Sequence, residues 1–380
     1  MSLTKVSKVT RRGIAAFIIF LAVLTIGRIG WNVGVRIYRH FFPPKKPAPE
    51  TAFGKIGIPK IPSSDINLSK WKYELDTPTA RLPAMPDRLP IFPLEKNPTT
   101  PLTELQAEDL AKSLGFTSSP KAISPTEYRW EEGKRTLEMN IVSQAFSLTY
   151  DSNTLEIQLT KGNAPTKQLA EDTAQNFLNR LSLGNKTLES AKREVSFVQI
   201  NNGKFSVVES LSQAQLTRVD LFKVLNVDGK SYDVLGPKPR QGLTTLLVAG
   251  GSYRSVVDQV PIAEYQNWKI KTEEGSTYPL LTSSKAWENL EAGNAALVYL
   301  KPQGAGFYEN PSPPLVEKIR IQNMQLAYFE SKQAQNYLTP IYVFKGLAEV
   351  KNQKPWEIVL YLNAIPQEWV NQEPQESNED

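Results

Sequence analysis

The chain has no cysteine and only one histidine among its 380 residues. Without thiols it cannot form disulfides, thiolate nucleophiles, zinc–thiolate sites or iron–sulfur clusters. The one histidine, His40, belongs to a basic N-terminal region, so a Ser-His-Asp triad or a multi-histidine metal site is excluded from the rest of the chain. We therefore predict no catalytic residue set, no metal site and no cofactor.

Acidic residues are missing from the first 46 residues, which hold nine lysines and arginines. Because the whole chain has 44 basic and 39 acidic residues, the remainder is mildly acidic. A nucleic-acid-binding domain carries a basic face on its folded body. The charge distribution therefore predicts that this protein does not bind nucleic acid.

Long apolar runs are also scarce, and the longest lies near the N-terminus. Residues 13–27 contain no charge, and apolar residues resume after Arg28. A bilayer core needs about 20 mostly apolar helical residues, so we predict a membrane anchor over 13–38 that contacts the lipid bilayer. A cleaved signal peptide is the alternative. The expected anchor residues are Ile14, Phe17, Leu21, Ile26, Trp31 and Tyr38. Basic residues flank this segment about equally, so charge does not decide its orientation. A basic tail of 12 residues ahead of a first span is typical of a signal anchor. We therefore predict a cytoplasmic tail over 1–12 and a single-pass protein in the cell membrane whose C-terminal body is extracytoplasmic.

Proline is abundant in the next segment, with thirteen between Phe41 and Pro101. Proline lacks a backbone donor, so this stretch cannot form regular helices or central strands. Its apolar residues, including Ile58, Ile91 and Phe92, favour an extended strap across the folded body over a free linker. A proline-motif ligand for a partner is the alternative.

Beyond residue 102, short sequence patterns typical of helices alternate with patterns typical of strands. Helices are predicted near 103–116, 169–183 and 283–293, each ending at or near a glycine. Strands are predicted between them, including 155–159 and 252–260, with hairpin turns at Asn202-Gly203 and Asp228-Gly229. In the strand near 317–329 the apolar alternation slips after Ile321, which indicates a bulge.

This order predicts an α+β fold made of repeated modules, each a short helix plus an antiparallel meander. The expected parts are the tail 1–12, the anchor 13–38, a stalk and strap 39–102, modules 103–164, 165–277 and 278–370, and an acidic disordered tail 371–380.

The third module carries a family resemblance. The residues that carry it are Ser283, Ala286, Trp287, Leu290 and Gly293, then Ala327-Tyr328-Phe329, and then the run from Tyr337 to Gly346. This spacing resembles the extracytoplasmic modules of bacterial accessory proteins of the YycH/YycI type. The resemblance implies PepSY-like modules and a binding or regulatory role, and it assigns no functional residue.

Aromatic side chains gather in the last three predicted strands. Those selected as a candidate binding surface are Tyr328, Tyr337, Tyr342 and Phe344. Alternation along a strand should turn half of such residues into the core and leave the others for a peptide- or glycan-binding groove.

The leading functional hypothesis is a membrane-anchored, non-catalytic binding or regulatory protein of the bacterial envelope. Its partner would be an envelope protein or a wall component. One alternative is a wall-active hydrolase with two carboxylates that converge in the fold. The other is a structural subunit of a surface complex.

Overall fold

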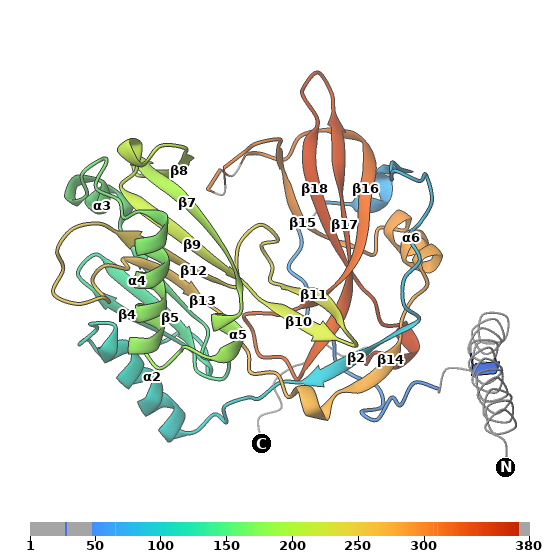
Figure 1. The fold of residues 1–380 in the computed structure, drawn as a ribbon, viewed down its shortest axis with the longest axis horizontal. Helices are drawn as coiled ribbons and strands as arrows, with labels where there is room; N and C mark the ends of the chain where they lie inside the picture. The colour runs from blue at the N-terminus through green and yellow to red at the C-terminus, as the bar shows by residue number, and fades with distance from the viewer. Residues whose placement is uncertain (1–26, 29–47, 65, 307, 310, 372–380) are drawn as a thin grey trace, which may run out of the picture. The chain divides into compact units, whose positions relative to one another are not determined.

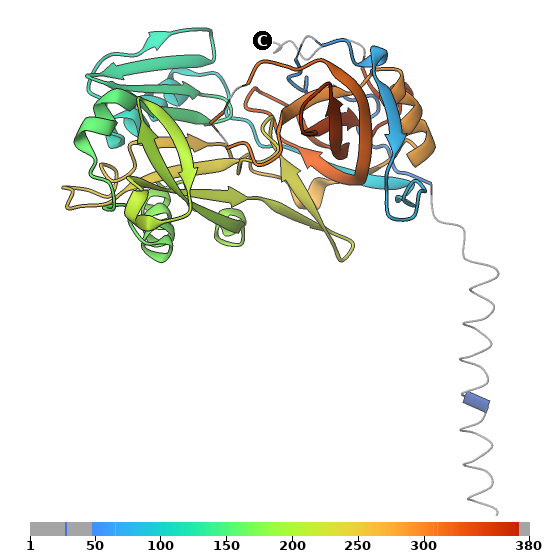
Figure 2. The same ribbon diagram turned by 90° about the horizontal axis from the view of Figure 1, so that it is seen from above.

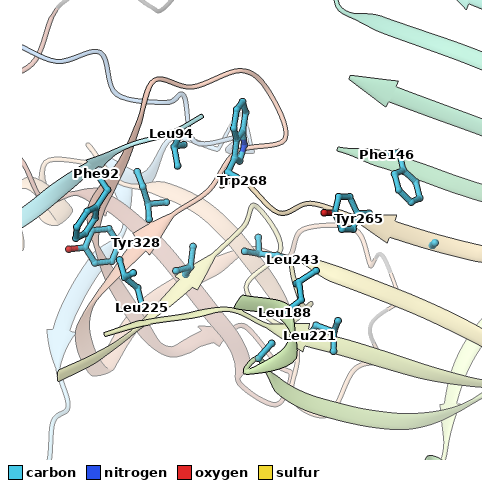
Figure 3. Packing of buried hydrophobic residues seen from close by; sticks show 14 of the residues in the cluster. Phe92, Leu94, Phe146, Leu188, Leu221, Leu225, Leu243, Tyr265, Trp268 and Tyr328 are labelled. Atoms are coloured by element: carbon cyan, nitrogen blue, oxygen red, sulfur yellow. The ribbon is translucent and has the colours of Figure 1, made fainter. Parts of the chain in front are cut away.

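Two β-sheets of nine strands each form the body of residues 49–371 (Figure 1). The computed structural model describes residues 27–28, 48–64, 66–306, 308–309 and 311–371. The first sheet takes its strands from residues 121–265, and the second takes most of its strands from residues 276–363. Buried side chains from both sheets meet in one main core (Figure 3), and a smaller separate cluster lies on each sheet.

All neighbouring strands of the first sheet are antiparallel. In spatial order they are β3 (Lys121–Ala122), β4 (Glu127–Glu132), β5 (Arg135–Asn140), β6 (Phe146–Tyr150), β13 (Ile262–Tyr265), β12 (Thr244–Ala249), β9 (Leu216–Phe222), β7 (Lys192–Asn201) and β8 (Lys204–Val208). The predicted turn between β7 and β8 is confirmed, because Asn202 and Gly203 both have positive φ, as a type I′ turn requires.

Helices lie on both faces of the first sheet. Threonine side chains cap α2 (Pro101–Ser113) and α4 (Lys167–Arg180), and α4 buries Phe177 and Leu178 in the core. The predicted helices of both segments are confirmed to within a few residues. The predicted strand 155–159 is wrong, because α3 (Ser152–Gln158) occupies it. The Asp151 carboxylate caps α3 by accepting the Thr154 N–H at 2.9 Å.

The second sheet has a main path of six strands and three additional strands. The path is β10 (Val224–Val227), β11 (Lys230–Leu235), β16 (Val316–Phe329), β17 (Tyr337–Val350), β18 (Trp356–Asn363) and β15 (Ala296–Pro302). The register of β16 with β17 shifts between Ile321 and Asn323, so the predicted bulge is confirmed. The predicted strand 252–260 is wrong, since turns and bends fill most of that segment.

The proline-rich segment lies across the second sheet as the predicted strap. Within it, β1 (Lys72–Leu75) pairs in parallel with β16, and β2 (Arg88–Pro93) pairs with β17 and with β14 (Ser276–Pro279). Ile91 is 0% exposed and Phe92 is 6% exposed. These contacts hold most of the segment against the body, and they leave little of it available as a proline-motif ligand.

The two faces of the second sheet belong to different apolar clusters, as alternation along its strands requires. One face contributes to the main core and is covered in part by α6 (Ser283–Glu291). The other face carries the cluster Leu235, Ala327, Phe329, Ile341, Val343, Val359 and Tyr361, which we call the second-face cluster. The second sheet is strongly curled when seen from above (Figure 2).

The remaining elements are short. They are α5 (Lys186–Glu189) and the 3₁₀ turns at Leu68–Lys70, Leu211–Gln213, Thr272–Glu274 and Gln367–Trp369.

This architecture corrects the predicted α+β fold of repeated PepSY-like modules. The body is mostly β, and modules 103–164 and 165–277 contribute strands to one shared sheet. The later part of module 165–277 also supplies β10 and β11 to the second sheet. Strands of different expected modules pair with one another, so the modules are not separate units. Local sequence patterns do not specify such pairing between distant segments.

The predicted membrane anchor is contradicted within the described part of the chain, where no helix is long and apolar enough to cross a bilayer. Apart from Gly27 and Arg28, segment 13–38 lies outside the described residues, as do the cytoplasmic tail 1–12 and nearly all of the acidic tail 371–380. The same holds for the expected anchor residues Ile14, Phe17, Leu21, Ile26, Trp31 and Tyr38.

Candidate functional site

A cavity of about 300 Å³ lies between the strap and the second face of the second sheet. The strands β16, β17 and β18 provide its floor, strap residues 58–63 provide its roof, and residues 294–296 form a side wall. The residues that line it are Ile58, Pro59, Lys60, Ile61, Ser63, Asn294, Ala295, Ala296, Phe329, Thr339, Ile341, Tyr361 and Asn363.

Strand register brings the floor residues together. Phe329 lies opposite Thr339, Ile341 lies opposite Asn363, and Tyr361 lies opposite Ala296. Residues directly opposite one another on adjacent strands share a face of the sheet. Alternation in three consecutive strands therefore brings Phe329, Ile341 and Tyr361 into one apolar cluster under the strap, with the polar residues Thr339 and Asn363 beside it.

Tyr361 is the most unusual residue of this surface. Its side chain is 0% exposed, and its hydroxyl has no hydrogen-bond partner among the described residues. The Phe329 ring contacts the Tyr361 ring edge to face, with centroids 6.1 Å apart. Burial, with a smaller contribution from the charge of Asp233, raises the pKa of Tyr361 far above its ordinary value. The phenol therefore keeps its proton and can donate a hydrogen bond.

Of the described residues that line the cavity, Lys60 alone is charged, and it is exposed. Hydroxyl and amide groups of Ser63, Asn294 and Asn363 make up most of the remaining polar lining. Among the described residues, no carboxylate lines the cavity, so these residues offer no acid–base pair. The arrangement suits binding of a mainly apolar molecule better than proton transfer.

The predicted binding surface is corrected by the burial of its members. Tyr328, Tyr342 and Phe344 are each 0% exposed and belong to the main core. Tyr337 is partly buried, and its ring centroid lies 5.0 Å from that of Phe53. Alternation along β16 and β17 turns the first three toward the main core, and nothing in the local sequence shows which half of the aromatic residues faces the cavity.

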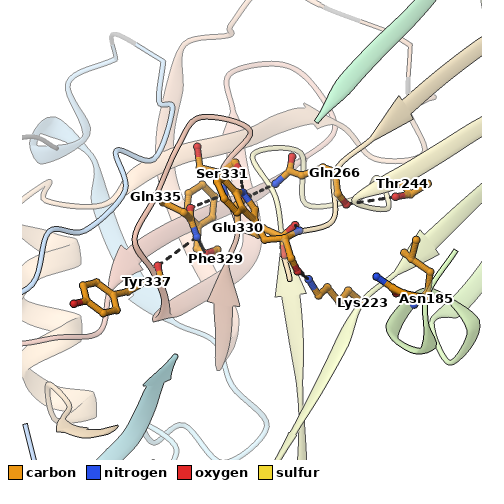
Figure 4. A network of polar contacts seen from close by, with 11 residues as sticks. Asn185, Lys223, Thr244, Gln266, Phe329, Glu330, Ser331, Gln335 and Tyr337 are labelled. Carbon is orange, nitrogen blue, oxygen red and sulfur yellow. Dashed lines mark hydrogen bonds and ion pairs between the residues drawn. The ribbon is translucent and has the colours of Figure 1, made fainter. Parts of the chain in front are cut away.

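A buried polar junction joins the two sheets behind the cavity floor (Figure 4). The Lys223 amine donates to the Glu330 carboxylate at 2.8 Å and to the Trp268 carbonyl at 2.7 Å, and both charged side chains are almost fully buried. The Trp268 N–H donates to the other Glu330 carboxylate oxygen at 3.0 Å. Glu330 directly follows Phe329 of the cavity, so this junction fixes the end of β16 relative to the first sheet.

A second ionic contact lies near this junction, at Glu264 of β13. Its carboxylate accepts from Lys332 at 2.6 Å and from Lys238 at 3.0 Å. Burial alone would raise the pKa of Glu264, but the two lysines lower it to about 2. Lys332 lies in the turn between β16 and β17, so this contact also ties the first sheet to the second.

A second cavity, of about 490 Å³, lies beside β7 and the loop around Arg240. Among its described lining residues, Glu194 is the only carboxylate, and Arg240 is ion-paired with Glu357. The described lining of these two cavities does not bring together the pair of carboxylates that the predicted hydrolase needs. In addition, no group of three or more potential metal ligands occurs among the described residues.

Comparisons with known proteins add no function. No protein-family model matches the chain, and no curated protein matches it. Among solved structures, it is similar to an uncharacterized protein from Eubacterium rectale ATCC 33656, with 12% sequence identity and a TM-score of 0.36. That similarity covers 73% of this chain and 84% of the other.

Proposed function

We propose that this protein is a non-catalytic binding protein, and that its cavity takes a small, mainly apolar molecule with one hydrogen-bond acceptor. The observation that carries this proposal is the buried hydroxyl of Tyr361, which has no partner among the described residues and belongs to a lining residue beside the apolar Phe329 and Ile341. A buried polar group without a partner costs about 1–3 kcal/mol. A ligand that accepts a hydrogen bond from this hydroxyl removes that cost.

The volume of the cavity limits the size of the ligand. An engineered apolar cavity of about 150 Å³ binds benzene, so about 300 Å³ admits a molecule of roughly ten non-hydrogen atoms. Burial contributes about 0.8 kcal/mol per carbon group. A ligand that buries six or seven such groups should bind with about 5 kcal/mol, which corresponds to a Kd on the order of 0.1 mM.

Acetophenone and isopropylbenzene test the proposal, because they are close in size and only acetophenone has an acceptor. We expect acetophenone to bind more tightly, measured as a Kd by ligand-detected NMR. Tyr361→Phe should weaken the binding of acetophenone by about 1 kcal/mol, or about fivefold in Kd, and leave the Kd of isopropylbenzene unchanged. Tyr150→Phe, in the first sheet, is the matched control and should change neither Kd. Absence of binding by both molecules would refute the proposal.

An envelope protein or wall component as partner, and an extracytoplasmic position, stay predictions. So do the alternatives of a wall-active hydrolase and a structural subunit of a surface complex. The cavity favours binding over hydrolysis, because the described part of its lining has a hydrogen-bond donor and no carboxylate.

A further inference from the structure

The hydroxyl of Tyr361 is shielded from solvent, so a ligand can reach it only if part of the cavity wall moves. We infer that strap residues 57–62 form a lid that opens to admit the ligand and closes over it. This inference rests on the proposed binding function. It depends on how the lid, the side wall and the floor are each held in place.

The lid is held at its two ends. At one end, the Ile56 N–H donates to the Trp369 carbonyl at 2.9 Å, and the Ile56 carbonyl accepts from Asn371 at 2.8 Å. At the other end, the Ser63 hydroxyl accepts from the Leu297 N–H at 3.0 Å. Between these ends, residues 57–62 make no backbone hydrogen bond to any described residue.

Two features of the lid sequence explain why the lid is held by side-chain contacts and not by backbone hydrogen bonds. Pro59 and Pro62 have no N–H to donate, and they restrict the conformations that the open segment can adopt. Ile58 and Ile61 contact the apolar clusters through their side chains alone. Opening the lid therefore breaks apolar contacts but no backbone ladder.

The other walls of the cavity are held more firmly. Phe329, Ile341 and Tyr361 belong to strands that pair with neighbours inside the sheet. Asn294 of the side wall is tied to the end of α6 through two hydrogen bonds to Asn289, of 3.0 and 3.1 Å. Local opening draws on segments with few backbone hydrogen bonds and few buried contacts. Among the walls of this cavity, the lid is the segment that meets this description.

The absence of cysteine allows a direct test, since a single introduced cysteine is the only thiol of the full chain. Ile61→Cys and Ile58→Cys place the thiol on the lid, Ile341→Cys places it on the floor, and Lys55→Cys places it on the exposed strap outside the lid. The labelling rate of each thiol with a disulfide reagent is measured at several urea concentrations below the unfolding transition.

We expect the lid thiols to label at least about tenfold faster than Ile341→Cys without urea, and with little dependence on urea, because local opening exposes little surface. The floor thiol should label only through larger unfolding and depend steeply on urea. The inference would be overturned if the lid thiols label as slowly as Ile341→Cys and if their labelling rates depend as steeply on the urea concentration.

Acetophenone separates this inference from the proposed function. At ten times its Kd, it should slow labelling of the lid thiols about tenfold and leave Lys55→Cys unchanged. If NMR shows that acetophenone binds, but the labelling rate of the lid thiols does not fall, the lid inference is wrong and the proposed binding function still holds. Fast local opening without any acetophenone binding would overturn both, since the lid would then have no ligand to admit.

Discussion

The buried ion pair of Lys223 with Glu330 makes a strong prediction about how the two sheets are joined. Among the described residues, Lys223→Met leaves the buried Glu330 carboxylate with one N–H donor, from Trp268, and no counter-ion. Glu330→Met leaves a buried ammonium with only a carbonyl partner. Each single substitution should therefore be strongly destabilising.

The size of the effect follows from the burial of the pair, whose side chains are 2% and 0% exposed. Removing one partner of such a pair costs about 3–5 kcal/mol, whereas replacing both with apolar residues is often close to neutral. In the double variant the Trp268 N–H loses its acceptor, which costs about 1–3 kcal/mol. The double variant should thus be no less stable than either single variant.

Urea unfolding at neutral pH, followed by circular dichroism and tryptophan fluorescence, measures these free energies. The account predicts a coupling energy of at least about 3 kcal/mol between the two positions. Single variants that lose under about 1 kcal/mol, or a double variant that loses the sum of the two, would refute the reasoning.

Three further predictions concern other parts of the molecule. The ionised Glu264 carboxylate contributes up to about 3 kcal/mol to the free energy of unfolding at pH values above its ordinary pKa of 4.5, and this contribution is lost as the pH falls toward about 2. Glu264→Gln should therefore flatten this part of the pH–stability profile. Gly242→Ala should cost about 1–3 kcal/mol or more in urea unfolding, because the new Cβ would lie 2.6 Å from the Leu221 nitrogen. Lys60→Met should weaken binding of 4-acetylbenzoate two- to fivefold in calorimetric titration and leave acetophenone unchanged, while Lys55→Met should change neither.

Local features of the fold could be predicted from the sequence. Helical apolar patterns that end at or near a glycine placed α2, α4 and α6 within a few residues, because these signals are local in the sequence. The slip in apolar alternation located the bulge of β16. The strand predicted at 155–159 failed because the cap formed by Asp151 outweighed a short apolar pattern.

Long-range features could not be predicted. The parallel pairing of β1 with β16, and of β11 with β16, joins segments that are distant in sequence, and no local pattern specifies such partners. The cavity shows the same limit. Alternation indicated that half of the C-terminal aromatic residues face away from the core, yet it could not show that this half includes Phe329 and Tyr361. The cavity depends on the strap, which covers that face of the sheet only in the folded chain, so the local sequence could not reveal it.

The most direct test of the central claim is to locate acetophenone on the protein by NMR of isoleucine methyl groups. Ile58, Ile61 and Ile341 line the cavity, whereas Ile319 and Ile321 are buried in the main core. The account predicts that added acetophenone shifts the first three methyl signals, with a common Kd, and leaves those of Ile319 and Ile321 in place. Unchanged signals from the three cavity residues at saturating acetophenone would contradict it.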